Sequence, residues 1–212
     1  MTPFTVHEGV AAPIPVDNVD TDQIIPSREM KTTGKTGLGE GLFAGWRYAE
    51  PGSREPAADF VLNRPDFADA SILVAGANFG CGSSREHAVW ALVDYGIRAV
   101  VAKSFGEIFY NNCIRNGVLP AALEPGEVDR LMAALEDGGR LAIDLPAQTV
   151  RLAGERRAAH FDIAPGAKAM LIEGLDPIGL TLKHEDAIER FLSRDREARA
   201  WAYATPEKEI TR

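Results

Sequence analysis

The chain has 212 residues, of which 45% are hydrophobic and 8% aromatic, so it is long enough to bury the core of one domain. Its formal net charge of -8, from 31 acidic and 23 basic residues, and the lack of any Lys/Arg-rich run exclude a typical nucleic-acid-binding surface. No window approaches the roughly 18 apolar residues of a membrane span, and the N-terminus lacks the pattern of a signal peptide. We therefore expect a soluble, cytoplasmic protein with no membrane or nucleic-acid partner.

The first 66 residues are rich in proline and show no regular hydrophobic period, so they predict irregular structure. Within them, the sequence KTTGKTGLGEG forms a Gly/Thr-rich loop from residue 31 to residue 41. Long ordered loops of this kind often carry function. This loop is therefore a candidate part of a site.

From residue 68 onward, short buried-looking strands alternate with amphipathic helices, and Gly96 and Gly117 stand where two helix C-terminal caps belong. This alternation predicts an α/β fold with a mostly parallel sheet. The expected strands cover residues 72–75, 97–102, 118–123 and 141–145, and the expected helices cover residues 83–95, 104–116 and 125–135.

The remainder of the chain predicts a strand-rich region and a helical end. Residues 148–182 look strand-rich, with turns at Gly154, Pro165–Gly166 and Asp176–Pro177. Residues 186–203 have a helical pattern with many charges, which suggests an exposed or partner-facing helix. We therefore expect one domain over residues 1–182 and a C-terminal helical tail over residues 183–212.

The sequence offers no metal or cofactor site of its own. Its two cysteines, Cys81 and Cys113, form no C-x-x-C pair and are too few for the four thiolates that an iron–sulfur cluster usually takes. The histidines show no ligand spacing. Any cluster must therefore come from another chain.

Three motif-like patterns fail on their spacing. The GKT sequence at residues 34–36 lacks the earlier glycine of a P-loop, because Glu29 stands in its place. The G-x-G that begins at Gly80 lacks the third glycine of a dinucleotide fingerprint, because position 85 is Arg85. The aspartates of residues 17–22 do not have the spacing of an EF-hand.

The segment GANFGCGSSREH, residues 76–87, is the strongest candidate for chemistry. It joins a buried strand to a helix, whose first turn offers unpaired backbone N–H groups and the positive end of a dipole. Gly82 allows close approach of a ligand, Ser83 and Ser84 supply hydroxyls, and Arg85 can grip a carboxylate with two hydrogen bonds. The segment therefore predicts an anion-binding, proton-transferring loop.

A purely structural interpretation stays open at this point, since Ser83 and Glu86 also have the spacing of a capping box. A serine hydroxyl is a poor base in water and becomes useful only among positive groups. No His–Asp pair completes a hydrolase triad, and neither serine lies in a G-x-S-x-G elbow. These features disfavour acyl transfer.

Three ordered motifs resemble one known family. They are DNVDTDQIIP at residues 17–26, GANFGCGSSREHAVWAL at residues 76–92 and SFGEIFYNNCIRNGVLP at residues 104–120. Together they are similar to the small subunits of 3-isopropylmalate dehydratase, within the aconitase superfamily, over most of the chain. The resemblance implies a three-layer β/β/α swivelling domain like the aconitase C-terminal domain.

The resemblance also implies roles for individual residues. Ser83 takes the place of the superfamily's catalytic serine base, and Arg85 that of an arginine that binds a substrate carboxylate. Gly82 and Ser84 would help to hold the substrate. Asp22, in the first motif, matches a position near the active site, although a turn or cap residue would also fit there.

The loop from residue 30 to residue 38 lies where family members adapt to the side group of the substrate. Lys31 or Lys35 would meet a carboxylate there, or would simply be solvated. The chain reads EMKTTGKTGLG, whereas many bacterial members read similarly to FLKR followed by RTGFG. Citramalate, which is (R)-2-methylmalate, or another substituted malate therefore stays open beside isopropylmalate.

By resemblance, the chain is the small subunit of a hydro-lyase of leucine biosynthesis that exchanges 2-isopropylmalate and 3-isopropylmalate by dehydration and rehydration. It would be active only with a large subunit that carries a [4Fe-4S] cluster, and would itself bind a small dicarboxylate and no cofactor. Two other classes stay open: a non-catalytic module that binds an organic acid, and an assembly role of the charged C-terminal helix.

Overall fold

The structure is a computed structural model that describes residues 1–31 and 34–203. It contains two compact units, Met1–Leu175 and Asp176–Arg212. The first unit is built on a sheet and the second is helical among its described residues. The division into a domain over residues 1–182 and a tail over residues 183–212 stays a prediction.

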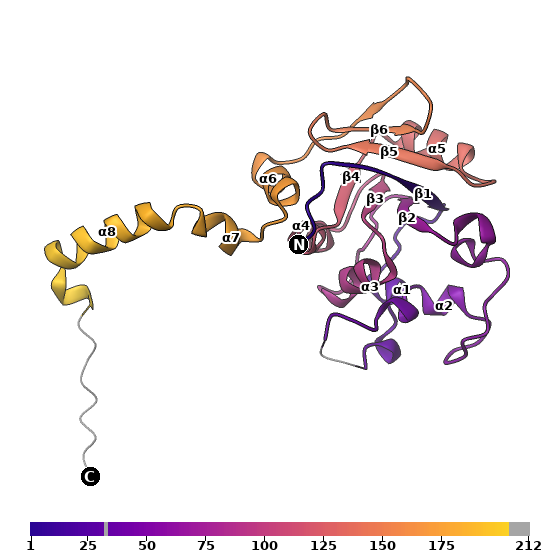
Figure 1. The fold of residues 1–212 in the computed structure, drawn as a ribbon. Helices are drawn as coiled ribbons and strands as arrows, with labels where there is room; N and C mark the ends of the chain where they lie inside the picture. The colour runs from indigo at the N-terminus through magenta and orange to yellow at the C-terminus, as the bar shows by residue number, and fades with distance from the viewer. Residues whose placement is uncertain (32–33, 204–212) are drawn as a thin grey trace, which may run out of the picture. The chain divides into compact units, whose positions relative to one another are not determined.

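A seven-stranded sheet with the order β4-β3-β2-β1-β5-β6-β7 forms the centre of the first unit (Figure 1). The pairs β1·β2, β2·β3 and β3·β4 are parallel, and β1·β5, β5·β6 and β6·β7 are antiparallel. The strands are β1 (Val6–Ile14), β2 (Ala70–Ala75), β3 (Ala99–Ala102), β4 (Leu119–Ala122), β5 (Arg140–Asp144), β6 (Thr149–Leu152) and β7 (Ala159–His160). The predicted α/β class is confirmed, but the sheet is mixed rather than mostly parallel.

The parallel half of the sheet follows the predicted alternation closely. Its crossover helices are α3 (His87–Tyr95) and α4 (Glu107–Asn116), and α5 (Pro125–Ala134) connects β4 to β5. Gly96 and Gly117 end α3 and α4 with positive φ angles of 110° and 79°, as their positions in the sequence indicated. Local patterns were therefore sufficient for this part of the fold.

The strand β1 was missed in the proline-rich N-terminal region, although it is central to the sheet. Its residues from Val6 to Val10 pair with β5, and its residues from Val10 to Ile14 pair with β2. Pro13, which argued against a strand, lies in the part that pairs with β2 alone. Among the described residues, the side of the backbone that faces away from β2 forms no ladder of hydrogen bonds in this part of the strand. A proline, which lacks an N–H, is therefore tolerated there.

The prediction of strands throughout residues 148–182 is wrong after β7. Two helices, α6 (Pro165–Glu173) and α7 (Pro177–Leu182), begin at the proline dipeptides that had suggested turns. Proline suits the first helical position because its missing N–H has no partner to lose there. Asp176 caps α7 by accepting a hydrogen bond of 2.7 Å from the N–H of Gly179.

Two apolar clusters cover the two faces of the sheet. Successive side chains of β2 point to opposite faces of the sheet, so Leu73 and Ala75 belong to one cluster and Ile72 and Val74 to the other. The first cluster includes residues of α1 (Thr21–Ile24) and α3, which lie together with α2 (Ala44–Arg47) in Figure 1. The second includes residues of α5 and α6. The sheet is therefore buried on both faces.

Short 3-10 turns complete the first unit. They are η1 (Ser27–Glu29), η2 (Gly39–Gly41), η3 (Val61–Asn63) and η4 (Pro65–Phe67). The second unit contains α8 (Glu185–Ala198) and the 3-10 turn η5 (Ala200–Tyr203) besides α7. The helical prediction for residues 186–203 is thus confirmed. None of the helices in the described ranges is long and apolar enough to cross a membrane.

The two cysteines should differ sharply in reactivity. Cys113 is fully buried in α4, and burial raises the pKa of its thiol well above the usual value, whereas Cys81 is partly exposed. Because the thiolate is the reactive form, we expect a disulfide-exchange reagent to modify Cys81 alone in the native protein and both thiols in denaturant. Counting the released chromophore checks this, and rapid labelling of native Cys81→Ala would contradict it.

Candidate functional site

Three loops meet at the carboxyl edge of the parallel strands. They follow β1, β2 and β3, and each contains the beginning of one of the three motifs that carried the family resemblance. The N–H of Gly80 donates to the carbonyl of Val19 at 2.7 Å, and the N–H of Phe79 donates to the carbonyl of Ser104 at 3.0 Å. Carboxyl ends of parallel strands are a common place for ligand sites in α/β folds.

Close contact between the second and third loops requires glycine. Gly80 has a φ of 75°, and a Cβ atom at this position would lie 2.1 Å from the ring of Phe109. A Cβ atom on Gly106 would lie 2.7 Å from the carbonyl oxygen of Gly80. These glycines are therefore explained by packing of the site's framework rather than by contact with a ligand.

Polar side chains fasten the first loop to the second. Asn18 and Asn78 both have positive φ angles, 56° and 55°, and the amide nitrogen of Asn78 lies 2.9 Å from the amide oxygen of Asn18. Asp17 accepts a hydrogen bond of 2.6 Å from the N–H of Ala77. Two residues in the left-handed region that share a hydrogen bond indicate a tightly specified loop geometry.

The helix after the second loop begins later than predicted, and the capping interpretation is wrong. α3 starts at His87, so Ser83 and Ser84 lie in the loop before it, and no side chain caps the helix. The carbonyl oxygen of Ser83 instead accepts hydrogen bonds from Thr21 Oγ1 at 3.0 Å and from the N–H of Arg85 at 2.7 Å. This turn holds the backbone while both serine side chains are exposed.

Ser104 and Glu107 also have the spacing of a capping box, but no such box forms at the start of α4. Gly106 stands at the N-cap of α4, and no side chain bonds there. The hydroxyl of Ser104 accepts a hydrogen bond of 2.8 Å from the N–H of Asn78, so it joins loops instead of capping the helix. In both places, long-range loop contacts take precedence over the local motif.

Arg85 lies in a cluster with Asp22 and Ser27. Its Nη1 atom forms an ion pair with Asp22 Oδ1 and lies 3.1 Å from Ser27 Oγ, which in turn donates to Asp22 Oδ1 at 3.1 Å. No residue in the described ranges hydrogen-bonds to Nε or Nη2 of Arg85. The guanidinium is thus held at one nitrogen and keeps a second edge for a ligand.

The sequence left open a role of Asp22 as a turn or cap residue. Asp22 lies inside α1 and caps no helix in the described part of the chain. α1 is capped by Asp20, which forms a capping box with Gln23. The carboxylate of Asp22 is directed to Arg85 instead. This ion pair holds the guanidinium of Arg85 in place.

Ser27 was missed by sequence reasoning. It lies just after the first motif, and nothing in the pattern PSREM marks a hydroxyl that bonds to a residue 58 positions away. Thr21 was missed for the same reason, although its hydroxyl fixes the carbonyl of Ser83. Contacts of this length are visible only after the loops have been placed in space.

The two candidate lysines have different surroundings. Lys31 is exposed, and no residue in the described ranges contacts its side chain through a hydrogen bond or ion pair. Lys35 lies with its Nζ atom 5.1 Å from the ring centroid of Trp90 and 3.4 Å from Asn116 Oδ1. Asn116 donates to Glu86 at 2.8 Å, which connects Lys35 through Asn116 to the end of the second loop.

No group of three or more His, Cys, Asp and Glu side chains that could hold a metal ion occurs in residues 1–31 and 34–203. Cys81 Sγ lies 3.4 Å from the carbonyl of Asn18, within the framework of the loops. Cys113 is buried in α4. The donor set of this chain does not fit an iron–sulfur cluster.

Comparisons with known proteins identify the class of this fold and site. Residues 1–126 match the family of the aconitase C-terminal domain, and residues 129–165 match the LeuD N-terminal family. Residues 178–204 match the family of the C-terminal domain of 3-isopropylmalate dehydratase small subunits. The predicted aconitase C-terminal-domain-like fold is confirmed.

Relatives over nearly the whole chain narrow the class further. The 3-isopropylmalate dehydratase small subunits of Rhodopseudomonas palustris strain BisA53 and Cupriavidus necator are 52% and 53% identical, over 95% and 96% of this chain and 100% and 99% of theirs. A crystal structure of 3-isopropylmalate dehydratase from Methanocaldococcus jannaschii, 29% identical, covers 87% of this chain and 98% of its own with a TM-score of 0.64. The chain therefore belongs to the family of 3-isopropylmalate dehydratase small subunits.

Substitution of Gly80 should test the packing of the loop framework. Gly80→Ala places a Cβ atom against the Phe109 ring at a positive φ, so we expect it to lower the free energy of unfolding by about 3 kcal/mol. Gly126→Ala is the control, because Gly126 lies in α5 with open space around its Cβ position. That variant should be about 0.5 to 1 kcal/mol more stable. Urea unfolding measures both, and equal stabilities would contradict the packing role.

Proposed function

We propose that this chain is the small subunit of a hydro-lyase that interconverts 2-isopropylmalate and 3-isopropylmalate by removing and re-adding water, in leucine biosynthesis. The observation that carries the proposal is the exposed loop with Ser83, Ser84 and Arg85, placed next to the other two family motifs by backbone hydrogen bonds. Identity above 50% to full-length small subunits supports the same reaction.

Arg85 binds a carboxylate of the substrate. Its planar guanidinium presents paired N–H donors that match a carboxylate, and Asp22 and Ser27 fix the side chain through Nη1 alone. Orientation of the arginine before binding lowers the entropy that the substrate must lose in the complex. Asp22 acts in this way through Arg85, and Gly82 and Ser84 line the approach of the substrate.

Ser83 transfers the proton. Removal of a proton from the carbon beside a carboxylate requires a base, and the alkoxide of Ser83 serves as one only if positive charge surrounds it. Arg85, two residues away, supplies part of that charge. On rehydration the same hydroxyl returns the proton, so the chain handles both half-reactions with one group.

The site is completed by a large subunit. In this proposal it carries the [4Fe-4S] cluster, which acts as a Lewis acid on the departing hydroxyl of the substrate. This chain binds and orients the dicarboxylate and moves the proton, and it is inactive alone. A cytoplasmic location stays a prediction.

In this proposal, the side group of the substrate determines which substituted malate the enzyme accepts. Lys31 and Lys35 belong to the loop expected to meet it, and Thr32 and Thr33 between them lie outside the described residues. Isopropylmalate is the substrate that the relatives' names favour. Citramalate and other substituted malates are the comparison set for a substrate screen on the assembled enzyme.

Replacement of the proposed base should stop turnover without harming the fold. No described side chain bonds to the hydroxyl of Ser83, so Ser83→Ala should change stability by less than about 0.5 kcal/mol. We expect kcat of the reconstituted two-subunit enzyme to fall by at least about 1000-fold. Ser84→Ala removes the neighbouring hydroxyl, which lines the approach of the substrate but transfers no proton, so it should retain most of kcat and change KM instead.

The measurement for both serines is the rate of conversion of 3-isopropylmalate after mixing with the large subunit. Turnover that survives in Ser83→Ala would overturn the assignment of the base. If the wild-type chain binds organic acids but gains no activity with the large subunit, the protein is a binding module instead.

The carboxylate clamp is tested by Arg85→Lys. Lysine keeps the positive charge but loses the paired planar donors and the geometry toward Asp22. We expect KM for isopropylmalate to rise by about 10- to 100-fold, with a smaller change in kcat. Steady-state kinetics of the assembled enzyme measure this, and an unchanged KM would exclude Arg85 from carboxylate binding.

A further inference from the structure

A buried carboxylate lies close to the candidate site and has no role in the proposed chemistry. Glu29 has a side chain that is only 5% exposed, and among the described residues it is the one buried residue that carries a charge. Burial of a carboxylate is costly unless both oxygens find partners. Its presence in this position therefore calls for a physical explanation.

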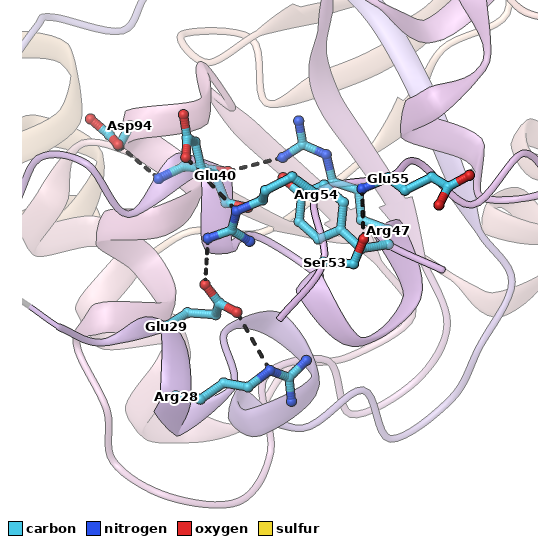
Figure 2. Close-up of polar contacts among 10 residues, drawn as sticks. Arg28, Glu29, Glu40, Arg47, Ser53, Arg54, Glu55 and Asp94 are labelled. Carbon is cyan, nitrogen blue, oxygen red and sulfur yellow. Dashed lines mark hydrogen bonds and ion pairs between the residues drawn. The ribbon is translucent and has the colours of Figure 1, made fainter. Parts of the chain in front are cut away.

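Two arginines compensate the charge of Glu29 (Figure 2). Arg54 Nη2 lies 2.8 Å from Glu29 Oε2, and Arg28 Nε lies 3.4 Å from Glu29 Oε1. The guanidinium of Arg54 also lies 4.9 Å from the ring centroid of Tyr48. Each carboxylate oxygen thus has a cationic partner, and the main partner is held on an aromatic face.

Stability alone does not account for such a pair. Replacement of a buried ion pair by apolar side chains is often neutral or stabilising, whereas the loss of one partner is destabilising. A pair of this kind is better explained by the geometry that it imposes on its neighbours.

Glu29 shares a single 3-10 turn with Ser27. The N–H of Met30 bonds to the carbonyl of Ser27 at 3.2 Å, and the N–H of Glu29 bonds to the carbonyl of Pro26 at 2.8 Å. Ser27 is the residue whose hydroxyl contacts both Asp22 and Arg85. A displacement of Glu29 therefore moves the support of the carboxylate clamp.

Glu29 and Arg54 also contact residues at both ends of the loop of residues 31–41. The N–H of Lys31 bonds to the carbonyl of Glu29 at 3.0 Å, and a Cβ atom on Gly41 would lie 2.7 Å from Glu29 Cβ. Arg54 extends from Glu29 to Glu40, where its Nε atom lies 4.0 Å from Oε2 (Figure 2). One ion pair thus connects the start of the loop, its end and the turn of Ser27.

We propose that the ion pair of Glu29 and Arg54 is a positioning device that fixes the turn Ser27–Glu29 and thereby sets Arg85 for substrate binding. The inference rests on the proposed function, because it assigns Arg85 to the substrate carboxylate. Neither Glu29 nor Arg54 touches the substrate. Both act through Ser27 on the strength of binding, so their loss changes KM and leaves kcat nearly unchanged.

The decisive variant is Glu29→Met, assayed in the complex with the large subunit. Methionine has a similar volume and no charge, and the Arg28 and Arg54 side chains that it leaves unpaired are 42% and 45% exposed, so water can solvate them and the chain should fold with little change in melting temperature. We expect KM for isopropylmalate to rise about tenfold while kcat stays within about twofold, because misplacement of the clamp weakens substrate and transition state alike.

Arg54 provides a graded series. Arg54→Met leaves Glu29 with Arg28 as its remaining cation and should raise KM by a similar factor, and Arg54→Lys should recover most of the affinity because it restores a charged donor. The control is Arg140→Met, since Arg140 pairs with Glu8 at 3.2 Å on the opposite, antiparallel side of β1. That variant should match the wild type.

A folded Glu29→Met enzyme with unchanged KM would overturn the positioning role, and so would a fall in kcat with no change in KM. A general loss of stability that Arg54→Lys fails to rescue would also overturn it. The proposed function fails separately, if the wild-type complex does not convert isopropylmalate at all.

Discussion

Hydrogen bonds between the loops after β1 and β2 hold the candidate loop of Ser83 in its place beside the first motif. The N–H of Gly80 bonds to Val19, the N–H of Thr21 bonds to Cys81, and the hydroxyl of Thr21 bonds to the carbonyl of Ser83. The proposed base is therefore held by the loop after β1 and the start of α1, where Thr21 lies 62 positions earlier in the chain. Loss of β1 from the sheet would separate Ser83 from its framework even if the helix after it were intact.

The sequence was a good guide wherever structure follows from local pattern. The alternation from β2 to α5 was predictable because apolar periods and the glycines at 96 and 117 act within a few residues. β1 was not, since its pairing with β2 and β5 is long-range and Pro13 is tolerated only because its segment pairs with β2 alone. The prolines at 165 and 177 were ambiguous, because proline begins helices as readily as it forms turns.

The residues of the candidate site also fall into those that local motifs identified and those that only long-range contacts revealed. Its motif residues were identifiable from the sequence, but the capping role of Ser83 was wrong because Thr21 and Arg85 bond to its carbonyl instead. Ser27 gave no signal, because a lone serine after a proline is common and its partners come from two other elements. The pairing of Glu29 with Arg54 was equally hidden, since the two residues are 25 positions apart.

The exposure of the loop is consistent with the proposal that a large subunit completes the site. Ser83 and Ser84 are exposed, and a serine surrounded by water is a poor base. Electrostatic stabilisation by Arg85 is also weak in water and becomes strong only where solvent is excluded. In the proposed function, a large subunit that covers the loop would therefore supply more than additional ligands, because it would remove the solvent that weakens both groups. The proposed role of the ion pair of Glu29 and Arg54 is to hold Arg85 in position before the large subunit covers the loop.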